Sequence, residues 1–263
     1  MKNYYFGESD NGYNAVLNNL TNTEVHSIET SSIPMADFWH PRNKDNINQF
    51  LQVLGLDIDI DNASKCFEYP VFALKNGKEI GRPSRTDLMI IDKKYNIAIE
   101  GKYTEPLYET IKKWKNNVSS SFSTKPAVLQ SWYNYIRPYT EYSDKDIDSL
   151  EQEVVYQFLH RTASACYGSL DNNKIPVVIY HLFFDINDEK NKSHQLSMAS
   201  KINDFGIGKL KFNNKIIFRI IMTPLLNVDE VKDKYQNCNS DIFLRLKETQ
   251  IYKFGESHIY GIY

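Results

Sequence analysis

Asp87, Glu100 and Lys102 are the residues whose types and spacing point most directly to chemistry. They lie within residues 85–105, RTDLMIIDKKYNIAIEGKYTE, where an aspartate heads one apolar run and a Glu-Gly-Lys triplet lies inside the next. Two carboxylates that converge repel each other and lose hydration, and a divalent cation removes both penalties. Mg²⁺ and Mn²⁺ prefer such oxygen ligands, and a lysine beside them can orient or help deprotonate a metal-bound water near a phosphate. The pattern predicts metal-assisted phosphodiester hydrolysis.

Two short strands must position these charges. The apolar runs 86–92 and 97–103 predict such strands, and the connection KKYN predicts that they pair antiparallel. Because side chains alternate across a sheet, Glu100 and Lys102 share one face of the second strand. Simple hairpin register pairs a residue near position 89 with one near 100, which leaves Asp87 within reach of both.

The rest of the chain predicts an α/β fold with the core order α-β-β-β-α-β. The periodicity changes from two to about 3.6 residues and back along the sequence, and turn residues separate the segments. The predicted helices are 43–56, 107–118, 127–136, 149–167, 195–206 and 227–235, and the strands are 66–74, 86–92, 97–103, 175–186 and 214–223. An irregular start, a loop over 75–84 and an unassigned tail complete the prediction.

Composition limits the class of protein. The 263 residues predict a single domain over 1–263, with a core at about 45–186 and an extension of the same domain at 187–263. The formal net charge of -2 gives no general attraction to nucleic acid or to acidic membranes. The 3 cysteines, Cys66, Cys166 and Cys238, are widely spaced, and no apolar run predicts a signal peptide or a membrane span. A cytoplasmic protein with no membrane partner is expected.

The charged triplet and the order of the elements resemble the PD-(D/E)XK, or restriction-endonuclease-like, nuclease superfamily over about residues 45–186. The resemblance implies a restriction-endonuclease-like core, with Asp87 and Glu100 as metal ligands, the carbonyl of Gly101 as a further ligand and Lys102 as the catalytic lysine. Mg²⁺ or Mn²⁺ is the implied cofactor and DNA the implied partner. The sequence departs from the family pattern at Thr86, which stands where a proline is usual.

The resemblance also implies that the helix before the fourth strand lends polar residues to the site. Residues 154–165, VVYQFLHRTASA, offer Gln157, His160 and Arg161. Gln157 and Arg161 are four residues apart and share one helix face. We expect Gln157 near the metal-bound water or phosphate and Arg161 on the DNA backbone, and Glu68 is the available upstream acid.

Several basic or aromatic segments have two interpretations each. Arg82, Ser84 and Arg85 can contact phosphates at the mouth of the site or lie in a solvated loop. Residues 37–46, DFWHPRNKDN, can contact DNA or cover the core, and the lysine-rich segment 112–117 can follow a backbone or only face water.

Three functions are compatible with the sequence. The first is a metal-dependent DNA nuclease with a restriction or mobile-element defence role by analogy, for which a homodimer would supply the two active sites that duplex cutting needs. The second is a catalytically silent nuclease-like fold that binds DNA or a protein partner. The third is a hydrolase of small phosphoesters. The histidine spacing does not match a zinc hydrolase, and a serine nucleophile elbow and a P-loop are absent.

Overall fold

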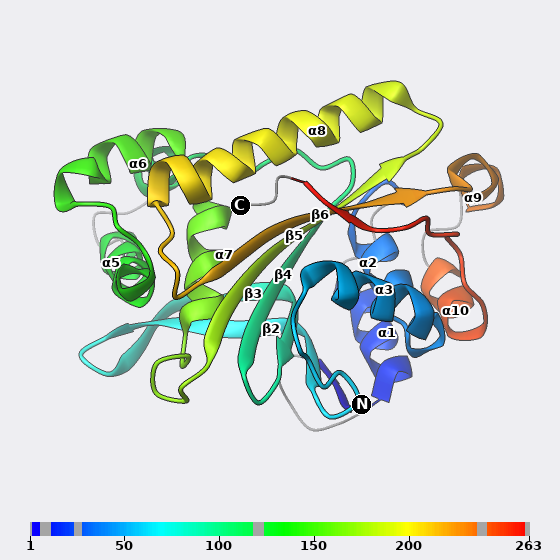
Figure 1. Cartoon of the computed structure of the whole chain (residues 1–263), viewed down its shortest axis with the longest axis horizontal. Helices are drawn as coiled ribbons and strands as arrows, with labels where there is room; N and C mark the ends of the chain where they lie inside the picture. The colour runs from blue at the N-terminus through cyan, green and yellow to red at the C-terminus, as the bar shows by residue number, and fades with distance from the viewer. Residues whose placement is uncertain (1, 6–11, 24–27, 118–123, 236–240, 261–263) are drawn as a thin grey trace.

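A mixed β-sheet forms the middle layer of the computed structural model, which describes residues 2–5, 12–23, 28–117, 124–235 and 241–260 (Figure 1). Within these residues the sheet has seven strands in sequence order, in which β3 is antiparallel to both of its neighbours, β2 and β4, and β4, β5 and β6 are parallel. The strands are β1 (Lys2–Tyr5), β2 (Ser64–Lys75), β3 (Lys78–Ile91), β4 (Tyr95–Lys102), β5 (Ile175–Asp185), β6 (Ile217–Leu225) and β7 (His258–Ile259). The predicted α/β class is confirmed.

Helices cover both faces of this sheet (Figure 1). One face carries α1 (Gly12–Thr23), α2 (Ser32–Phe38), α3 (Lys44–Leu54), α9 (Val228–Tyr235) and α10 (Asp241–Glu248). The other carries α4 (Ile111–Asn116), α5 (Lys125–Ile136), α6 (Ile147–Glu153), α7 (Tyr156–Cys166) and α8 (Glu189–Asn203), which continues into the π-helical segment Asp204–Leu210. Short 3-10 turns are Pro41–Asn43, Arg137–Tyr139 and Asp144–Asp146.

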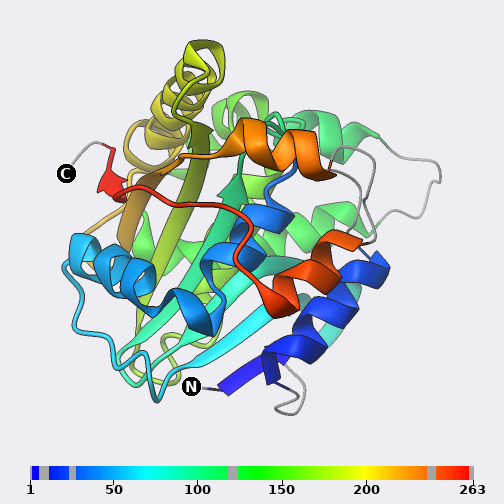
Figure 2. The ribbon, with the colours of Figure 1, turned by 90° about the vertical axis from the view of Figure 1, so that its right-hand side faces the viewer.

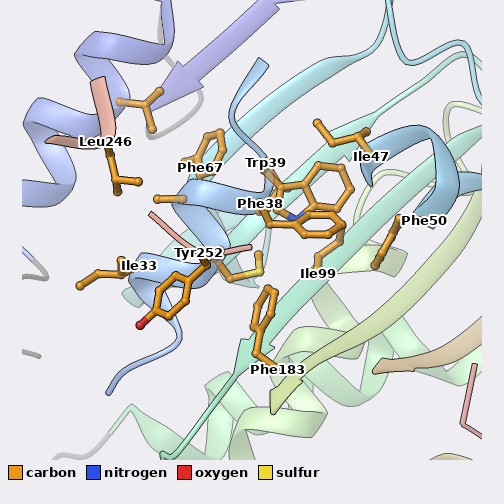
Figure 3. Close-up of a cluster of buried hydrophobic side chains, with 14 of the residues drawn as sticks. Ile33, Phe38, Trp39, Ile47, Phe50, Phe67, Ile99, Phe183, Leu246 and Tyr252 are labelled. Carbon is orange, nitrogen blue, oxygen red and sulfur yellow. The ribbon is translucent and has the colours of Figure 1, made fainter. Parts of the chain in front are cut away.

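Two hydrophobic cores result, one on each face. In the first, Phe38 and Trp39 from the end of α2 pack beside Phe50 of α3, above Ile99 of β4 and Phe183 of β5 (Figure 3). The segment 37–46 therefore begins inside this core, in agreement with the interpretation that it covers the core. Helix α3 ends as predicted, because Gly55 adopts the left-handed conformation typical of a C-cap.

The predicted strand and helix order is found, with differences at both ends of the chain and in two of the predicted segments. Elements α3, β2, β3, β4, α7 and β5 follow one another in the order α-β-β-β-α-β, and α4 to α6 lie between β4 and α7. The predicted irregular start contains β1, α1 and α2, and the unassigned tail contains α10 and β7. These elements are short or lie beside turn residues, and contacts with distant parts of the chain stabilise them.

The predicted loop over 75–84 is wrong. Only Asn76 and Gly77 form a turn, and both have positive φ angles, of 53° and 73°. This is the conformation of a tight two-residue hairpin, for which Asn-Gly is the preferred sequence. Strand β3 therefore begins at Lys78, and the candidate residues Arg82, Ser84 and Arg85 lie on a strand.

The single helix predicted over 149–167 is also wrong. It breaks at Val154 and Val155, whose ψ angles are 136° and 143°, so that α6 and α7 are separate helices. The extended backbone there pairs with the start of α4, where the Ile111 N–H donates to the Val154 carbonyl at 2.9 Å. Two adjacent β-branched residues suit this short extended segment better than a helix interior.

Asp37 links α2 to the C-terminal segment, which crosses the helices of the N-terminal region in Figure 2. Its side chain is fully buried, and its Oδ2 accepts the N–H groups of Ile251 and Tyr252 at 2.8 and 2.6 Å. Burial raises the pKa of Asp37 from 3.8 to about 7, although the two N–H groups oppose that rise. This carboxyl therefore binds its proton more tightly in the folded chain than in the unfolded chain.

We expect Asp37→Asn to flatten the pH dependence of stability. With a folded-state pKa raised above the unfolded one, the wild type keeps this contribution below about pH 4 and loses it as the pH rises toward 7. One pKa unit corresponds to about 1.4 kcal/mol, so the loss amounts to several kcal/mol at most. Asparagine keeps an acceptor oxygen without the charge. Urea unfolding at pH 5 and pH 8 measures how much the free energy of unfolding changes with pH in each protein. An equal change in the wild type and in Asp37→Asn would contradict the prediction.

Candidate functional site

Strands β3 and β4 bring Asp87 and Glu100 to opposite positions. The register pairs Leu88 with Ile99 and Met89 with Ala98, and its continuation places Asp87 opposite Glu100. Met89 therefore pairs with Ala98, two residues away from the partner near position 100 that the sequence predicts. The shift brings the two carboxylates closer than the sequence prediction did.

Glu100 and Lys102 share one face of β4, as predicted. Ile97 and Ile99 belong to the core beneath α1 to α3, whereas Ala98 belongs to the core beneath α7. The alternation of side chains therefore directs Glu100 and Lys102 toward α7. Apolar neighbours along the strand hold this segment in the sheet centre, between β3 and β5.

Four side chains form one ion-paired cluster with Gln157 of α7. Lys102 Nζ lies 3.2 Å from Glu100 Oε1, and Gln157 Nε2 donates a hydrogen bond to the same oxygen. Arg161 pairs with Glu100 Oε2, and its Nη2 lies 3.3 Å from Asp87 Oδ1. The side chains of Glu100, Lys102 and Arg161 are only 2%, 4% and 3% exposed, whereas Asp87 is 29% exposed. Asp87 is thus the open edge of an otherwise buried cluster.

Gly101 fixes the distance between the sheet and α2. A Cβ atom at this position would lie 2.4 Å from Met35 Cγ, far inside van der Waals contact. The missing side chain lets α2 pack directly on β4, and the Gly101 N–H donates to Asp87 Oδ2 at 2.9 Å. The glycine of the Glu-Gly-Lys triplet therefore allows a close approach of two elements and positions Asp87.

Glu68 occupies a strained position on β2 next to Asp87. The register pairs Phe67 with Leu88 and Tyr69 with Thr86, so Glu68 lies between these pairs, opposite Asp87. Its φ angle is 50°, a left-handed conformation that is uncommon outside glycine and is found more often at functional sites. Glu68 lines the same cavity as Asp87 and Glu100, which agrees with its selection as the upstream acid.

A cavity of about 160 Å³ opens beside the cluster. One wall is polar and contains Glu68, Asp87, Glu100, Lys102 and Gln157. The opposite wall is largely apolar and comes from the N-terminal helices and β2. It contains Leu20, Ser31, Ser32, Met35, Ala36 and Phe67, and Glu105 and Tyr108 complete the lining.

The charges in this cavity set the protonation states. Burial raises the pKa of Asp87 well above its usual value, and the neighbouring Glu100 and Glu68 carboxylates add to that rise. Burial would also raise the pKa of Glu100, but Arg161 and Lys102 overcome it and hold that pKa below its usual value. Burial would lower the pKa of Lys102, but Glu100 and Asp87 raise it, so Lys102 carries its charge.

Asp87 and Glu100 supply the oxygen donors that a hard divalent cation prefers, but Lys102 and Arg161 already balance their charge. The described residues contain no group of three or more His, Cys, Asp or Glu side chains that could hold a metal ion. A cation here would therefore rely on two carboxylates, with a backbone oxygen and water completing its shell. The raised pKa of Asp87 comes mainly from burial, and a bound cation would oppose that rise.

The structure places the helix candidates inside the site. Gln157 donates to Glu100, and its Oε1 is buried without a hydrogen-bond partner, while its place near a metal-bound water or phosphate stays a prediction. Arg161 does not lie on the outer surface, because it is buried against Asp87 and Glu100 and also donates to the Arg85 carbonyl. This differs from the expected contact with the DNA backbone, since the helix face turns inward over β3 and β4.

The remaining candidates lie around the site. Arg82 and Arg85 are exposed on β3, where phosphate contact stays a prediction. Ser84 Oγ lies 2.6 Å from His160 Nδ1, and burial lowers the pKa of His160 well below its usual value, so this histidine is neutral. Trp114, from the lysine-rich segment 112–117, stacks on Tyr156 of α7 with ring centroids 3.7 Å apart.

Sequence reasoning missed the residues that close the cavity. Glu105 accepts the N–H of Tyr103 at 2.9 Å and the Ser31 hydroxyl at 2.7 Å, which ties the end of β4 to the start of α2. Tyr108 follows and is 64% exposed. The sequence YTEPLY directly after the triplet was the only available signal, and it does not reveal contact with a helix 74 residues earlier.

Comparison with known proteins places the chain in a family. A family model described as "Domain of unknown function (DUF6946)" matches residues 11–212, which is more than half of the chain. The chain belongs to this family. The matched residues of this DUF6946 member include the whole ion-paired cluster and the cavity around it. No curated protein and no solved structure matches the chain.

Two further expectations concern cysteines and membranes. Cys66 and Cys166 are buried and free, and Cys238 lies outside the described residues. Across the described ranges, no helix has both the length and the apolar character that crossing a membrane requires.

Proposed function

We propose that this protein is a metal-dependent nuclease that hydrolyses DNA phosphodiester bonds, built on a restriction-endonuclease-like core of α3, β2, β3, β4, α7 and β5. The observation that carries the proposal is the convergence of Asp87, Glu100 and Lys102 on one face of the sheet, at a cavity that α7 closes with Gln157. Single residues of these types are common at strand ends, whereas their convergence in a cavity is typical of hydrolytic sites.

Asp87 and Glu100, with the Gly101 carbonyl, are the groups that would hold Mg²⁺ or Mn²⁺. When bound, such an ion lowers the pKa of a coordinated water and polarises the phosphate. The partial exposure of Asp87 makes it the side from which phosphate and ion approach, since its neighbours are almost fully buried.

Lys102 and Gln157 would act on the phosphate and the water. The Lys102 ammonium is kept charged by Glu100 and Asp87, so it can hold a non-bridging phosphate oxygen and offset charge that develops during attack. The unpartnered Gln157 Oε1 is shielded from solvent, and a rotation of the side-chain amide that turns it to the cavity would let it accept a hydrogen bond from the attacking water. These roles need no movement of β4, because both side chains already face the cavity.

One observation favours the second function, a silent nuclease-like fold that binds DNA or a protein partner. Arg161 already pairs with both carboxylates, so an internal cation partly performs the neutralising role of a metal. An arginine in that position competes with a divalent cation for the same oxygens. The two functions differ in whether the carboxylates bind an ion strongly enough to compete with the guanidinium group.

We expect Lys102→Ala to lower metal-dependent cleavage by about 100-fold, which is the usual effect of removing one group that stabilises transition-state charge. Linear, circular and branched DNA are incubated with Mg²⁺, Mn²⁺, Ca²⁺ or a chelator, and products are resolved on gels. Lys93→Ala, in the exposed turn before β4, is the matched control and should cleave like wild type. Absence of metal-dependent cleavage in the wild type, or full activity of Lys102→Ala, would rule out the nuclease.

A further inference from the structure

The cavity beside the cluster has two unlike walls. Strands β3 and β4 and helix α7 contribute charged and amide side chains, whereas α1, α2 and β2 contribute the apolar side chains of Leu20, Met35, Ala36 and Phe67 together with Ser31 and Ser32. A sugar-phosphate backbone is charged and hydrated, so it would gain little from contact with apolar side chains so close to the reacting phosphate. A nucleobase that is not paired to a second strand has apolar faces that would bury against these side chains.

The size of the cavity also limits what can enter. Its volume of about 160 Å³ lies below the range of about 300–1,000 Å³ typical of sites for drug-sized ligands. Such a space admits one base or one sugar-phosphate group rather than a base pair. Helix α2 cannot withdraw easily, because Met35 packs against the backbone of Gly101 and Ser31 is bonded to Glu105.

Tyr108 stands at the rim of this cavity with its ring in solvent. It is 64% exposed, and Lys102 Nζ lies 5.5 Å from the ring centroid. An aromatic ring this exposed contributes little to the core. Placed beside the cation that would hold a phosphate, it is positioned to stack on the base of an adjacent nucleotide, an interaction worth about 1–3 kcal/mol per base.

We propose that the substrate presents an unpaired nucleotide to this cavity, as in a single strand or a frayed end, and that Tyr108 stacks on its base. This inference rests on the proposed nuclease function and names its substrate class.

The test measures binding without cleavage. Fluorescein-labelled oligothymidylate and a blunt hairpin duplex are titrated by anisotropy in a chelator, so that hydrolysis does not interfere and Lys102 stays in place beside Tyr108. We expect the single strand to bind more tightly than the duplex, and Tyr108→Ala to raise its Kd by about 10-fold, within the range that the loss of one stacked base predicts. Tyr108→Phe keeps the ring and should bind normally, and Tyr167→Ala, which removes a less exposed tyrosine at the far end of α7, should also have no effect.

Cleavage by the otherwise wild-type enzyme separates the two proposals. Tyr108→Ala should raise the KM for single strands and leave kcat nearly unchanged. One outcome would overturn the stacking inference and leave the nuclease intact. In it, the enzyme cuts duplex with a metal, and Tyr108→Ala changes neither the binding of single strands nor their KM. Tyr108-dependent binding of single strands with no cutting under any metal would overturn the nuclease and leave the recognition of unpaired nucleotides.

Discussion

Asp87→Asn is expected to lower metal-dependent cleavage by at least about 1000-fold without unfolding the protein. A bound metal contributes several kcal/mol of transition-state stabilisation, and each 1.4 kcal/mol is a factor of about ten in rate. Asparagine is nearly the same size and keeps an oxygen that can accept the Gly101 N–H, which lies 2.9 Å from Asp87 Oδ2. It removes the negative charge that the ion needs.

The matched variants separate charge from geometry. Asp87→Ala loses both the charge and the contact with Gly101, so it should be as inactive as Asp87→Asn and also less stable. Asp57→Asn removes an aspartate whose side chain is 87% exposed, and it should leave cleavage unchanged. Cleavage by Asp87→Asn within about tenfold of wild type would mean that Asp87 is not a metal ligand.

The same substitution should stabilise the fold near pH 8. Burial and the neighbouring Glu100 and Glu68 raise the pKa of Asp87, so the folded state resists its ionisation. Stability from this group is therefore greatest at low pH and falls as the pH rises through the raised value. An asparagine side chain does not ionise, so the unfolding midpoint of Asp87→Asn in urea at pH 8 should exceed that of wild type. Higher stability with lost activity would be the sign of a residue kept for function.

The sequence predicted the part of the site that depends on local geometry. Strand alternation alone places Glu100 and Lys102 on one face, and the short turn between β3 and β4 alone brings Asp87 near them. Gln157 and Arg161 share a helix face for the same reason. Spacing along one element decides which residues share a face, whereas the hairpin register, which decides how close Asp87 comes to Glu100, differs from the prediction by two residues.

The rest depended on contacts between distant segments. Nothing in the sequence around Glu68 indicates its left-handed backbone, and nothing around Ser31 indicates its bond to Glu105. Arg161 was expected on the DNA, but its final position depends on how closely α7 packs on the sheet, which buries it against two carboxylates. Most of the apolar side chains that line the cavity come from α1 and α2. The hydrophobic periodicity did not predict either helix.

Arg161→Met is expected to lower the free energy of unfolding by about 3–5 kcal/mol in a chelator at pH 8. Removing one partner of a buried ion pair leaves the remaining charge without compensation, and this penalty exceeds the value of the pair itself. Here the guanidinium is 3% exposed and serves both Asp87 and Glu100. Arg137→Met is the matched control, because its pair with Asp144 is at the surface and should contribute less than about 1 kcal/mol.

Unfolding measured with and without Ca²⁺ then tests whether the two carboxylates can bind a metal. An ion that binds only the folded state raises the free energy of unfolding according to its concentration and affinity. In the wild type, the ion competes with Arg161 for Asp87 and Glu100, so the gain in the unfolding midpoint should be small. In Arg161→Met the same oxygens have lost their internal cation, so Ca²⁺ should restore a substantial part of the lost stability. If Ca²⁺ stabilised neither protein, the cluster would be a self-neutralised network without affinity for a metal, and the silent fold would replace the nuclease as the function that the site supports.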